Sequence, residues 1–332
     1  ADGVRGFDAD AANAAGALAR GAITEQATSV EAAAAGATAV FVATPVPAVT
    51  RAATSAIGAS DDGCVVTDIG STKGGVLRDL SPEERRRFVG GHPICGGETS
   101  GPAGARGDLF DGAVWFLTPP DEIDAELYTR VHRTVAALGA RPTAISVDEH
   151  DRLMALVSHL PHVLAAMLVN EAADATGEGR DVLSAAGPSF RDITRVAGSN
   201  PELWADILVE NAAALAPVVR ESGERLSALA RAIEDRDRQA VLTEFVSASE
   251  RHSRIGPAAP EGGEQITLEV PVADRPGALS AITTALGDAG VNIADLSLRP
   301  GPRGGQGTLV VTVEGGADAD LARGVLSRAA DL

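Results

Sequence analysis

Short apolar runs alternate with alanine-rich helical stretches through the first third of the chain. The predicted strands are residues 4–7, 39–43, 64–68 and 113–117, with helices near residues 10–20 and 46–59. Strands that alternate with helices at this spacing indicate βαβ units and a parallel sheet. We therefore expect an α/β domain of the doubly wound class over residues 1–145.

The pattern changes at Ser146, where a helical region begins. Ser146 and Glu149 have the spacing of a capping box, and apolar residues recur at helical spacing after them. Helical patterns continue to about Arg254, which predicts an all-helical domain over residues 146–255. Its wide apolar faces need a cover, and a second copy of the chain in a homodimer would provide one.

A third region follows a linker at residues 256–264, which is rich in glycine and proline. Beyond it, strands are expected at residues 266–272, 291–298 and 308–313, with helices at residues 278–289 and 318–329. This β-α-β-β-α order predicts a small α+β unit of the ferredoxin-like class over residues 265–332, without its last strand.

The composition restricts the partners and the compartment. A net charge of −18 over 332 residues disfavours binding to nucleic acid or to an anionic membrane, because both would repel the chain. The two cysteines, Cys64 and Cys95, suit a reducing compartment better than a disulfide framework. No spanning apolar run or signal pattern is evident. We expect a cytoplasmic protein.

The stretch GGHPICGGETSG, residues 90–101, places His92 among glycines and is expected to form a loop. On its own, His92 could simply cap a turn. The segment DIGSTKG starts at Asp68, the last residue of a predicted strand, and so lies at the strand end where ligands bind in open α/β sheets. A helix N-cap at Ser71 or Thr72 is the structural alternative.

Further candidate residues lie in the helical region. His159 and His162 are three residues apart around Pro161, which should kink the helix. No carboxylate or cysteine completes a ligand set, so no metal site is predicted. Arg191 and Arg195 are one helical turn apart and suit a carboxylate, and a surface ion pair is the structural alternative.

Four motifs, taken together, resemble one known family. They are DIGSTKG, GGHPICGGETSG, HDRLMALVSHLPH and FRDITRVAGSNPELW. This combination resembles prephenate dehydrogenase, the TyrA-type enzyme of tyrosine biosynthesis, and the resemblance covers nearly the whole chain. The segments VADRPGALSAI and GVNI resemble an ACT domain, an amino-acid-sensing module that some members carry.

The resemblance implies an NAD-dependent oxidoreductase that oxidises and decarboxylates prephenate, or its amino counterpart arogenate. His92 matches the catalytic histidine that accepts the ring hydroxyl proton, and Ser71 matches a serine that orients it. Arg195 matches the arginine that binds the substrate carboxylate. Other substrate-pocket positions that match are Glu98, Ser158, His159, His162 and Trp204, the last of which reaches across a dimer interface.

The cofactor half departs from the family pattern at its start, because no first strand with a GxGxxG phosphate loop precedes Val4. We expect this segment to have been trimmed. Asp8 falls where an acidic residue would bind the adenosine ribose, which favours NAD over NADP. Asp10 is a second candidate, and helix capping is the alternative for both. Further cofactor contacts are predicted at Thr44, Pro45, Asp68 and Ser71.

In the ACT-like region, the resemblance implies that Asp274, Gly277 and Asn292 bind an amino-acid effector, with tyrosine as the expected one. A purely structural dimerisation module is the alternative.

Two other functions compete with this interpretation. A 3-hydroxyacid dehydrogenase would be expected to carry a catalytic lysine in the helical domain, yet the only lysine is Lys73. A non-catalytic amino-acid sensor would have no reason to keep His92, Ser71 and Arg195 together. The choice between prephenate and arogenate stays open.

Overall fold

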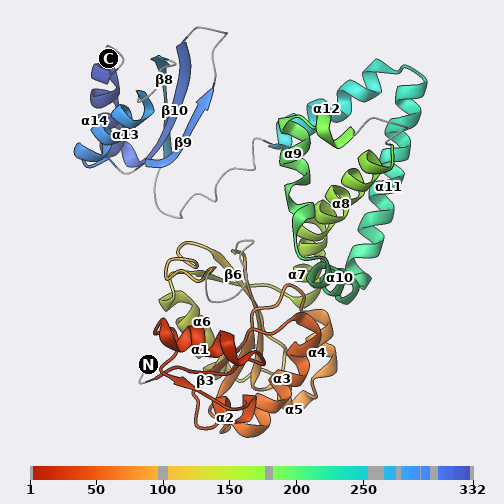
Figure 1. Ribbon diagram of the computed structural model, residues 1–332, viewed down its shortest axis with the longest axis vertical. Helices are drawn as coiled ribbons and strands as arrows, with labels where there is room; N and C mark the ends of the chain where they lie inside the picture. Colours follow the sequence, from red (N-terminus) through yellow and green to blue (C-terminus); the bar gives the residue numbers. More distant parts are fainter. Residues whose placement is uncertain are drawn as a thin grey trace. The chain divides into compact units, whose positions relative to one another are not determined.

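The computed structural model describes residues 3–95, 104–175, 182–252, 265–273, 278–291, 293–299 and 306–329. The chain divides into two compact units, Ala1–Asp237 and Arg238–Leu332 (Figure 1). The first unit joins an α/β part to a helical part, and the second contains the small α+β unit.

The α/β part has a five-stranded sheet and a separate parallel pair, β1 (Arg5–Gly6) and β2 (Glu25–Gln26). The sheet has the order β3-β4-β5-β6-β7. Its strands are β3 (Ala39–Val42), β4 (Val65–Asp68), β5 (Phe88–Pro93), β6 (Val114–Thr118) and β7 (Arg141–Ala144). All neighbours are parallel except β5 and β6, which are antiparallel.

The antiparallel pair corrects the expectation of a wholly parallel sheet. A parallel neighbour needs a crossover connection, which is usually a helix, whereas an antiparallel neighbour can follow a simple return of the chain. Among the described residues between β5 and β6, there is no α-helix. The chain therefore returns beside β5 in the opposite direction.

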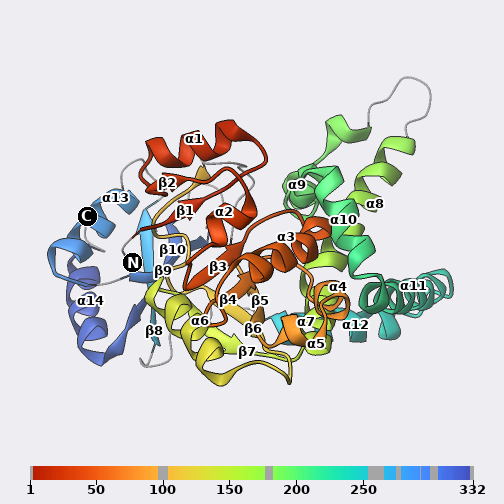
Figure 2. The ribbon, with the colours of Figure 1, turned by 90° about the horizontal axis from the view of Figure 1, so that it is seen from below.

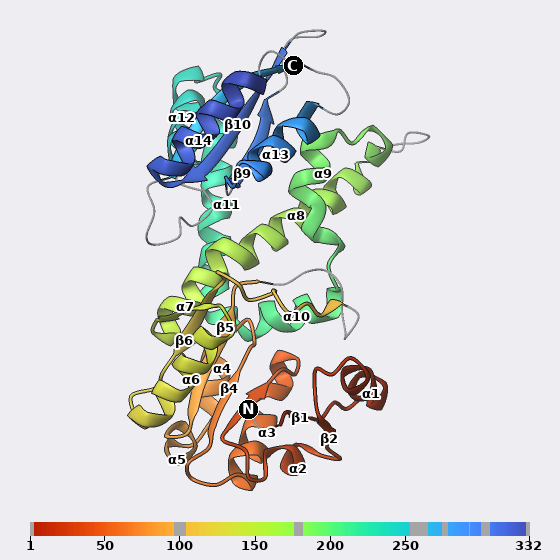
Figure 3. The same cartoon turned by 90° about the vertical axis from the view of Figure 1, so that its left-hand side faces the viewer.

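Helices cover both faces of the sheet, as a doubly wound fold requires (Figures 2 and 3). On one face, α3 (Val46–Ala59) and α4 (Gly74–Asp79) pack side chains such as Val49, Ala53 and Val76 against Val42, Val66 and Phe88. On the other, α6 (Ala125–Ala137) packs Leu127, Val131 and Val135 against Val65, Val89 and Leu117. The shorter helices are α1 (Ala11–Ala19), α2 (Val30–Ala34) and α5 (Pro82–Arg85). The predicted Rossmann-like α/β class is confirmed.

The helical part begins with the predicted capping box, in which the Ser146 hydroxyl accepts the Glu149 amide and the Glu149 carboxylate accepts the Ser146 amide. Helix α7 (Val147–Met154) continues through a π-helical segment (Ala155–His159) into α8 (Leu160–Asp174). The π-helical segment ends two residues before Pro161, whose ring cannot fit a regular α-helical interior. The helices that follow are α9 (Pro188–Thr194), α10 (Pro201–Glu210) and α11 (Ala212–Glu234).

By length and composition alone, Val147–Asp174 passes as a membrane-spanning helix, which corrects the expectation that the chain has no apolar run of that length. Its first turns, however, carry His150 and Asp151, which are buried against the α/β part. Buried polar groups with hydrogen-bond partners on another element are typical of a packed helix. These contacts favour packing within the protein over insertion in a bilayer.

The second unit contains α12 (Arg238–His252) and a three-stranded antiparallel sheet of order β8-β10-β9. The remaining elements are β8 (Gln265–Ala273), α13 (Ala278–Asp288), β9 (Ile293–Arg299), β10 (Gln306–Glu314) and α14 (Gly315–Ala329). Alternate residues of the strands, including Leu309 and Val311, pack against Leu286 and Leu326 of the two helices. The predicted β-α-β-β-α order is confirmed.

Candidate active site

His92 lies near the end of strand β5, not in a loop as its glycine-rich surroundings suggested. The glycines serve close packing within the sheet. A Cβ atom on Gly91 would overlap the backbone oxygen of Asp68, and one on Gly90 would overlap the Thr118 hydroxyl. Because neither position has room for a side chain, glycine lets β5 pack closely between its neighbours and fixes the place of His92.

The described partner of His92 is a second histidine, His150 on α7. Nδ1 of His92 lies 2.9 Å from Nε2 of His150, and Nδ1 of His150 lies 2.8 Å from Oδ1 of Asp151. Burial, followed by the nearby charge of Lys73, lowers the pKa of His92 to about 2. His92 is therefore neutral near pH 7 and able to accept a proton.

Asp151 connects the helical part to the loop after β4. Its Oδ1 accepts the amide of Lys73 at 3.0 Å, and its Oδ2 accepts the amide of Gly74 at 2.8 Å. Burial raises the pKa of Asp151, but the hydrogen bonds from His150 and from these two amides outweigh it and hold the pKa below its usual value. Asp151 is accordingly a carboxylate in the folded protein.

A buried ion pair joins Lys73 to Asp68 beneath this loop. Asp68 also accepts the amides of Gly70 at 2.8 Å and Gly91 at 3.0 Å. The Asp68 carboxylate was predicted to contact a cofactor, but it is fully buried and its hydrogen bonds stabilise the loop and the start of the glycine strand. Asp68 therefore stabilises the loop from its buried side and exposes no carboxylate to a cofactor.

His159 lies on the π-helical segment and is almost completely buried. Its Nδ1 contacts the side-chain amide nitrogen of Asn211 at 3.0 Å, and its Nε2 has no hydrogen-bond partner among the described residues. Burial lowers the pKa of His159 to about 4. A neutral imidazole with one buried, unpaired nitrogen can hydrogen-bond a ligand.

Four other predicted substrate residues are connected to His159 or to one another by the contacts that follow. The ring of Trp204 lies edge-on to His159 at 6.0 Å and stacks on His162 at 3.4 Å. Nδ1 of His162 donates to the backbone oxygen of Ser158 at 2.9 Å. Burial lowers the pKa of His162, and the charge of Arg195 lowers it further. Arg195, at the end of α9, is thus electrostatically coupled to this cluster.

The predicted cofactor residues lie at the ends of strands or on the loops that follow them. Asp8 is exposed just after β1, and its carboxylate accepts the amide of Asp10, which caps α1. Thr44, after β3, has a buried hydroxyl with no partner among the described residues, and Pro45 precedes α3. Ser71 is partly buried on the loop between β4 and α4. The unpaired Thr44 hydroxyl and the exposed Asp8 carboxylate, each on a segment that follows a strand, are polar groups of the kind that can bind a nucleotide.

Sequence reasoning missed the residues that hold the histidines in place. His150, Asp151 and Asn211 were not singled out, although His150 and Asp151 belong to a quoted motif. The available signal was the pair of adjacent histidine and aspartate residues at the start of a long apolar helical pattern. Four predicted residues lie outside the described part of the chain, and they are Glu98, Asp274, Gly277 and Asn292.

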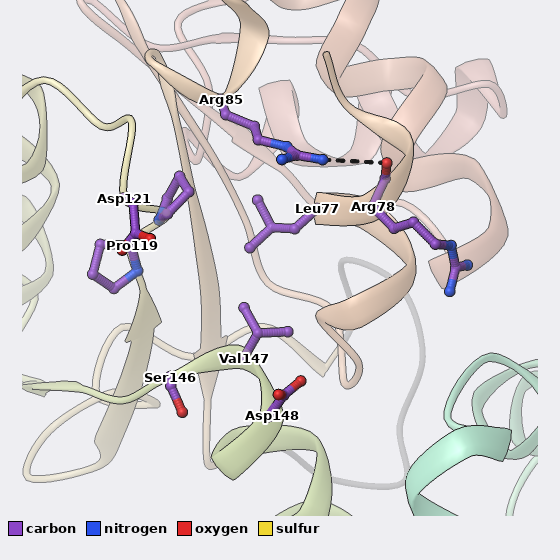
Figure 4. A pocket seen from close by; sticks show the side chains of 9 residues that line it. Leu77, Arg78, Arg85, Pro119, Asp121, Ser146, Val147 and Asp148 are labelled. Atoms are coloured by element: carbon purple, nitrogen blue, oxygen red, sulfur yellow. Dashed lines mark hydrogen bonds between the residues drawn. The ribbon is translucent and has the colours of Figure 1, made fainter. Parts of the chain in front are cut away.

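A separate surface cavity of about 370 Å³ lies between α4, α5 and the start of α7 (Figure 4). Leu77 and Val147 form its apolar lining, and Arg85 donates to the backbone oxygen of Arg78 at 3.3 Å. None of the predicted catalytic or binding residues lines this cavity. The histidine cluster is therefore the better candidate for chemistry.

Family models match three consecutive parts of the chain. Residues 2–144 match the nucleotide-binding domain of prephenate dehydrogenase, and residues 146–247 match its dimerisation domain. Residues 266–330 match an ACT domain.

Known proteins agree with these matches. Prephenate dehydrogenase of Bacillus subtilis is 31% identical over 238 residues, which are 70% of this chain and 64% of that protein. Cyclohexadienyl dehydrogenase of Zymomonas mobilis is 34% identical over 183 residues, or 54% of this chain and 62% of that protein. The chain thus spans less than two thirds of the length of these curated relatives.

A solved structure shows the same architecture. Prephenate dehydrogenase from Aquifex aeolicus, in complex with hydroxyphenyl propionate and NAD+, superposes with a TM-score of 0.72 at 28% identity. The match covers 76% of this chain and 89% of that one. With the two domain models matched in order over residues 2–144 and 146–247, it shows that this chain belongs to the prephenate dehydrogenase family.

Proposed function

We propose that this protein catalyses the NAD-dependent oxidative decarboxylation of prephenate to 4-hydroxyphenylpyruvate. The observation that carries the proposal is the position of His92. It ends a strand of the α/β part as a neutral imidazole, and it is hydrogen-bonded to a helical part that also presents His159, His162 and Trp204. A substrate between these elements would contact a base and a set of ring nitrogens together.

The residues of the chain supply proton transfer and orientation. Nε2 of His92 accepts the proton of the ring hydroxyl while the ring carboxylate departs as carbon dioxide and the ring becomes aromatic. NAD, when bound, supplies the hydride acceptor. Acid–base help of this kind is worth about 10²–10⁴ in rate. Ser71, on the neighbouring loop, is placed by this proposal to orient His92 toward the substrate.

Substrate recognition is assigned to the cationic and aromatic side chains of the helical part. The guanidinium of Arg195 binds the side-chain carboxylate, because a charge-assisted pair is the strong way to hold a dianion. The unpaired Nε2 of His159 faces the same ligand, and the stacked rings of His162 and Trp204 close the pocket. Ser158 and Glu98 complete the set of pocket residues in this proposal.

Cofactor binding is assigned to the segments that follow β1 and β3. Asp8 would accept the adenosine ribose hydroxyls, a role that favours NAD over NADP. The orphaned hydroxyl of Thr44, with Pro45 behind it, would lie along the cofactor. Each of these side chains belongs to a strand end or to the loop that follows it, where nucleotides bind in doubly wound sheets.

We further propose that the protein is a cytoplasmic homodimer. Tyrosine inhibits it by binding to its ACT domain. The helical part exposes many large apolar side chains, which include Leu156, Val157, Met167, Ile193, Leu203, Val209, Leu226 and Ile233. Apolar area on this scale is typical of a face covered by a partner. Asp274, Gly277 and Asn292 are the proposed effector residues.

Assay of the full-length protein tests the function directly. Prephenate and arogenate, each with NAD or NADP, are compared by the absorbance of the reduced cofactor. We expect the highest kcat/KM with prephenate and NAD. Faster turnover of arogenate would replace the substrate but keep the chemistry, whereas no turnover with either substrate would overturn the proposal.

A further inference from the structure

The buried ring of His92 is by itself a weak base, and its hydrogen-bond partners can take up the positive charge that it holds poorly. Burial disfavours a positive charge on its ring, so a proton taken from the substrate would be poorly held there. Behind it lie His150, which is completely buried, and the Asp151 carboxylate. The two contacts, 2.9 Å and 2.8 Å long, form one continuous chain from the base to an anion.

The carboxylate end determines where the protons of this chain reside. Asp151 accepts two backbone amides, those of Lys73 and Gly74, so it is present as an acceptor. Nδ1 of His150 must then donate to it. In neutral His150 the other nitrogen, Nε2, carries a lone pair and accepts Nδ1–H of His92. Nε2 of His92 is thereby left unprotonated and available to the substrate.

The backbone oxygen of Asp151 also determines which nitrogen of His159 carries the proton, through the side chain of Asn211. The side-chain amide of Asn211 donates to the backbone oxygen of Asp151 at 2.9 Å. A carbonyl oxygen is only an acceptor, so this contact identifies the Asn211 atom as the nitrogen. Nδ1 of His159, which contacts the same nitrogen, is then an acceptor, and its Nε2 carries the proton. His92 thus presents a lone pair, and His159 presents an N–H group.

We propose that His150 and Asp151 are positioning residues that form a proton relay behind His92. The substrate hydroxyl proton moves to Nε2 of His92, and the proton on Nδ1 of His92 moves to Nε2 of His150. One proton enters and one shifts, so the net positive charge moves to His150, beside the Asp151 carboxylate. The inference deepens the proposed function and depends on His92 acting as the base.

The titratable groups around His92 support this direction. Lys73 on the loop after β4, His150 on α7 and His159 on the π-helical segment all disfavour a positive charge on His92. Burial lowers the pKa of Lys73, and its ion pair with Asp68 opposes that effect. Asp151 is the anion in direct contact with His150. The imidazole beside Asp151 is consequently the better place for the proton.

Two variants test the relay, His150→Gln and Asp151→Asn, with Asp148→Asn as the control. Asp148 is an exposed acid on the same helix, one turn before Asp151. We expect each relay variant to lower kcat at least about tenfold, as part of the 10²–10⁴ available to acid–base catalysis, with KM changed less than about twofold. The control should match the parent protein.

The pH profile of kcat/KM separates a relay from a structural role. Protonation of the His92–His150 pair inactivates the base, and Asp151 favours that protonation in the parent enzyme. Removal of the Asp151 charge or of the His150 imidazole should therefore move the acidic limb of the kcat/KM profile to lower pH. An equal loss at every pH, with an unmoved limb, would overturn the relay. His150→Gln decides the matter if Asp151→Asn does not fold.

Nitrogen-15 spectra of histidine-labelled protein test the resting state without any turnover. We expect His92 to show a protonated Nδ1 and an unprotonated Nε2, with signals assigned by the His92→Asn and His150→Gln variants. The reverse pattern would overturn the relay even in an active enzyme. An inactive parent protein, by contrast, would overturn the proposed function, and the spectra would still decide the relay.

Discussion

The position of His92 at the end of β5 makes the proposed chemistry depend on a single ring. His92→Asn keeps a polar side chain of similar size but removes the basic nitrogen. We expect kcat to fall by about 10²–10⁴, the usual worth of acid–base catalysis, while KM changes little. Steady-state kinetics with prephenate and NAD would measure this. His132→Asn, a change at an exposed histidine on α6, is the control. Undiminished turnover of the His92 variant would remove the assigned base.

Arg195 should affect binding more than turnover. It is close enough to His162 to lower the pKa of that ring, and the proposed substrate carries a carboxylate on its side chain. Arg195→Gln should chiefly raise KM for prephenate, because it removes a charge-assisted contact present in both ground and transition states. Arg133→Gln, at an exposed arginine of α6, controls for the change in net charge. A KM equal to that of the parent protein would place the anchor elsewhere.

At the residue scale, the sequence indicated the side chains proposed to contact a ligand better than the residues that hold them in place. His92 and His159 belong to recognisable motifs. Their partners do not stand out, because hydrogen bonds such as the one between His92 and His150 join residues 58 positions apart. Asn211 is an ordinary residue at a helix start until the fold brings it to His159.

At the scale of elements, periodicity predicted the helices and the apolar strands but failed where packing overrides propensity. Strand β5, with the sequence FVGGHP, contains two glycines and a proline, all unfavourable in strands. It forms because Gly90 and Gly91 fit against neighbours that exclude any side chain. β7, RPTA, has no apolar alternation either, and it forms as a parallel neighbour of β6.

The close packing of β5 gives a stability prediction. Gly91→Ala would drive a methyl group into the backbone oxygen of Asp68, which cannot move without disturbing β4. We expect a loss of about 1–3 kcal/mol in the free energy of unfolding, the usual cost of overpacking. Urea titration followed by tryptophan fluorescence would measure it, since Trp115 pairs with β5.

Gly58→Ala is the matched control for that substitution. Gly58 lies within α3, and nothing lies within 4 Å of the position its Cβ would take. Alanine there should be neutral or stabilising by about 0.5–1 kcal/mol, because it favours the helix. A Gly91 variant as stable as this control would show that the strand can relax.

At the scale of the molecule, the buried histidines make stability depend on pH. The pKa of His159 is lowered to about 4 and that of His92 to about 2, whereas an unfolded histidine titrates near 6.5. Below about pH 6.5 the unfolded chain therefore binds protons that the folded protein does not. The free energy of unfolding should fall as the pH is lowered from 7.5 to 5.

Tryptophan fluorescence isolates this effect, because both tryptophans, Trp115 and Trp204, belong to the first unit. Urea titrations at pH 7.5, 6 and 5 would measure how the free energy of unfolding depends on pH. His159→Gln should weaken that dependence. His132→Gln, at an exposed histidine, should leave it unchanged. Stability that is flat or rises on acidification would show that these rings are protonated in the folded protein.

The two-unit organisation predicts that regulation and catalysis can be separated. Residues 265–329 have their own core, built from strands β8 to β10 and helices α13 and α14. Removal of residues 264–332 should therefore leave prephenate turnover and the dimer intact while abolishing tyrosine inhibition. Kinetics with added tyrosine, together with analytical ultracentrifugation, would measure both properties. Inhibition that persists in the shortened chain would overturn this assignment and would place the effector in the active site around His92.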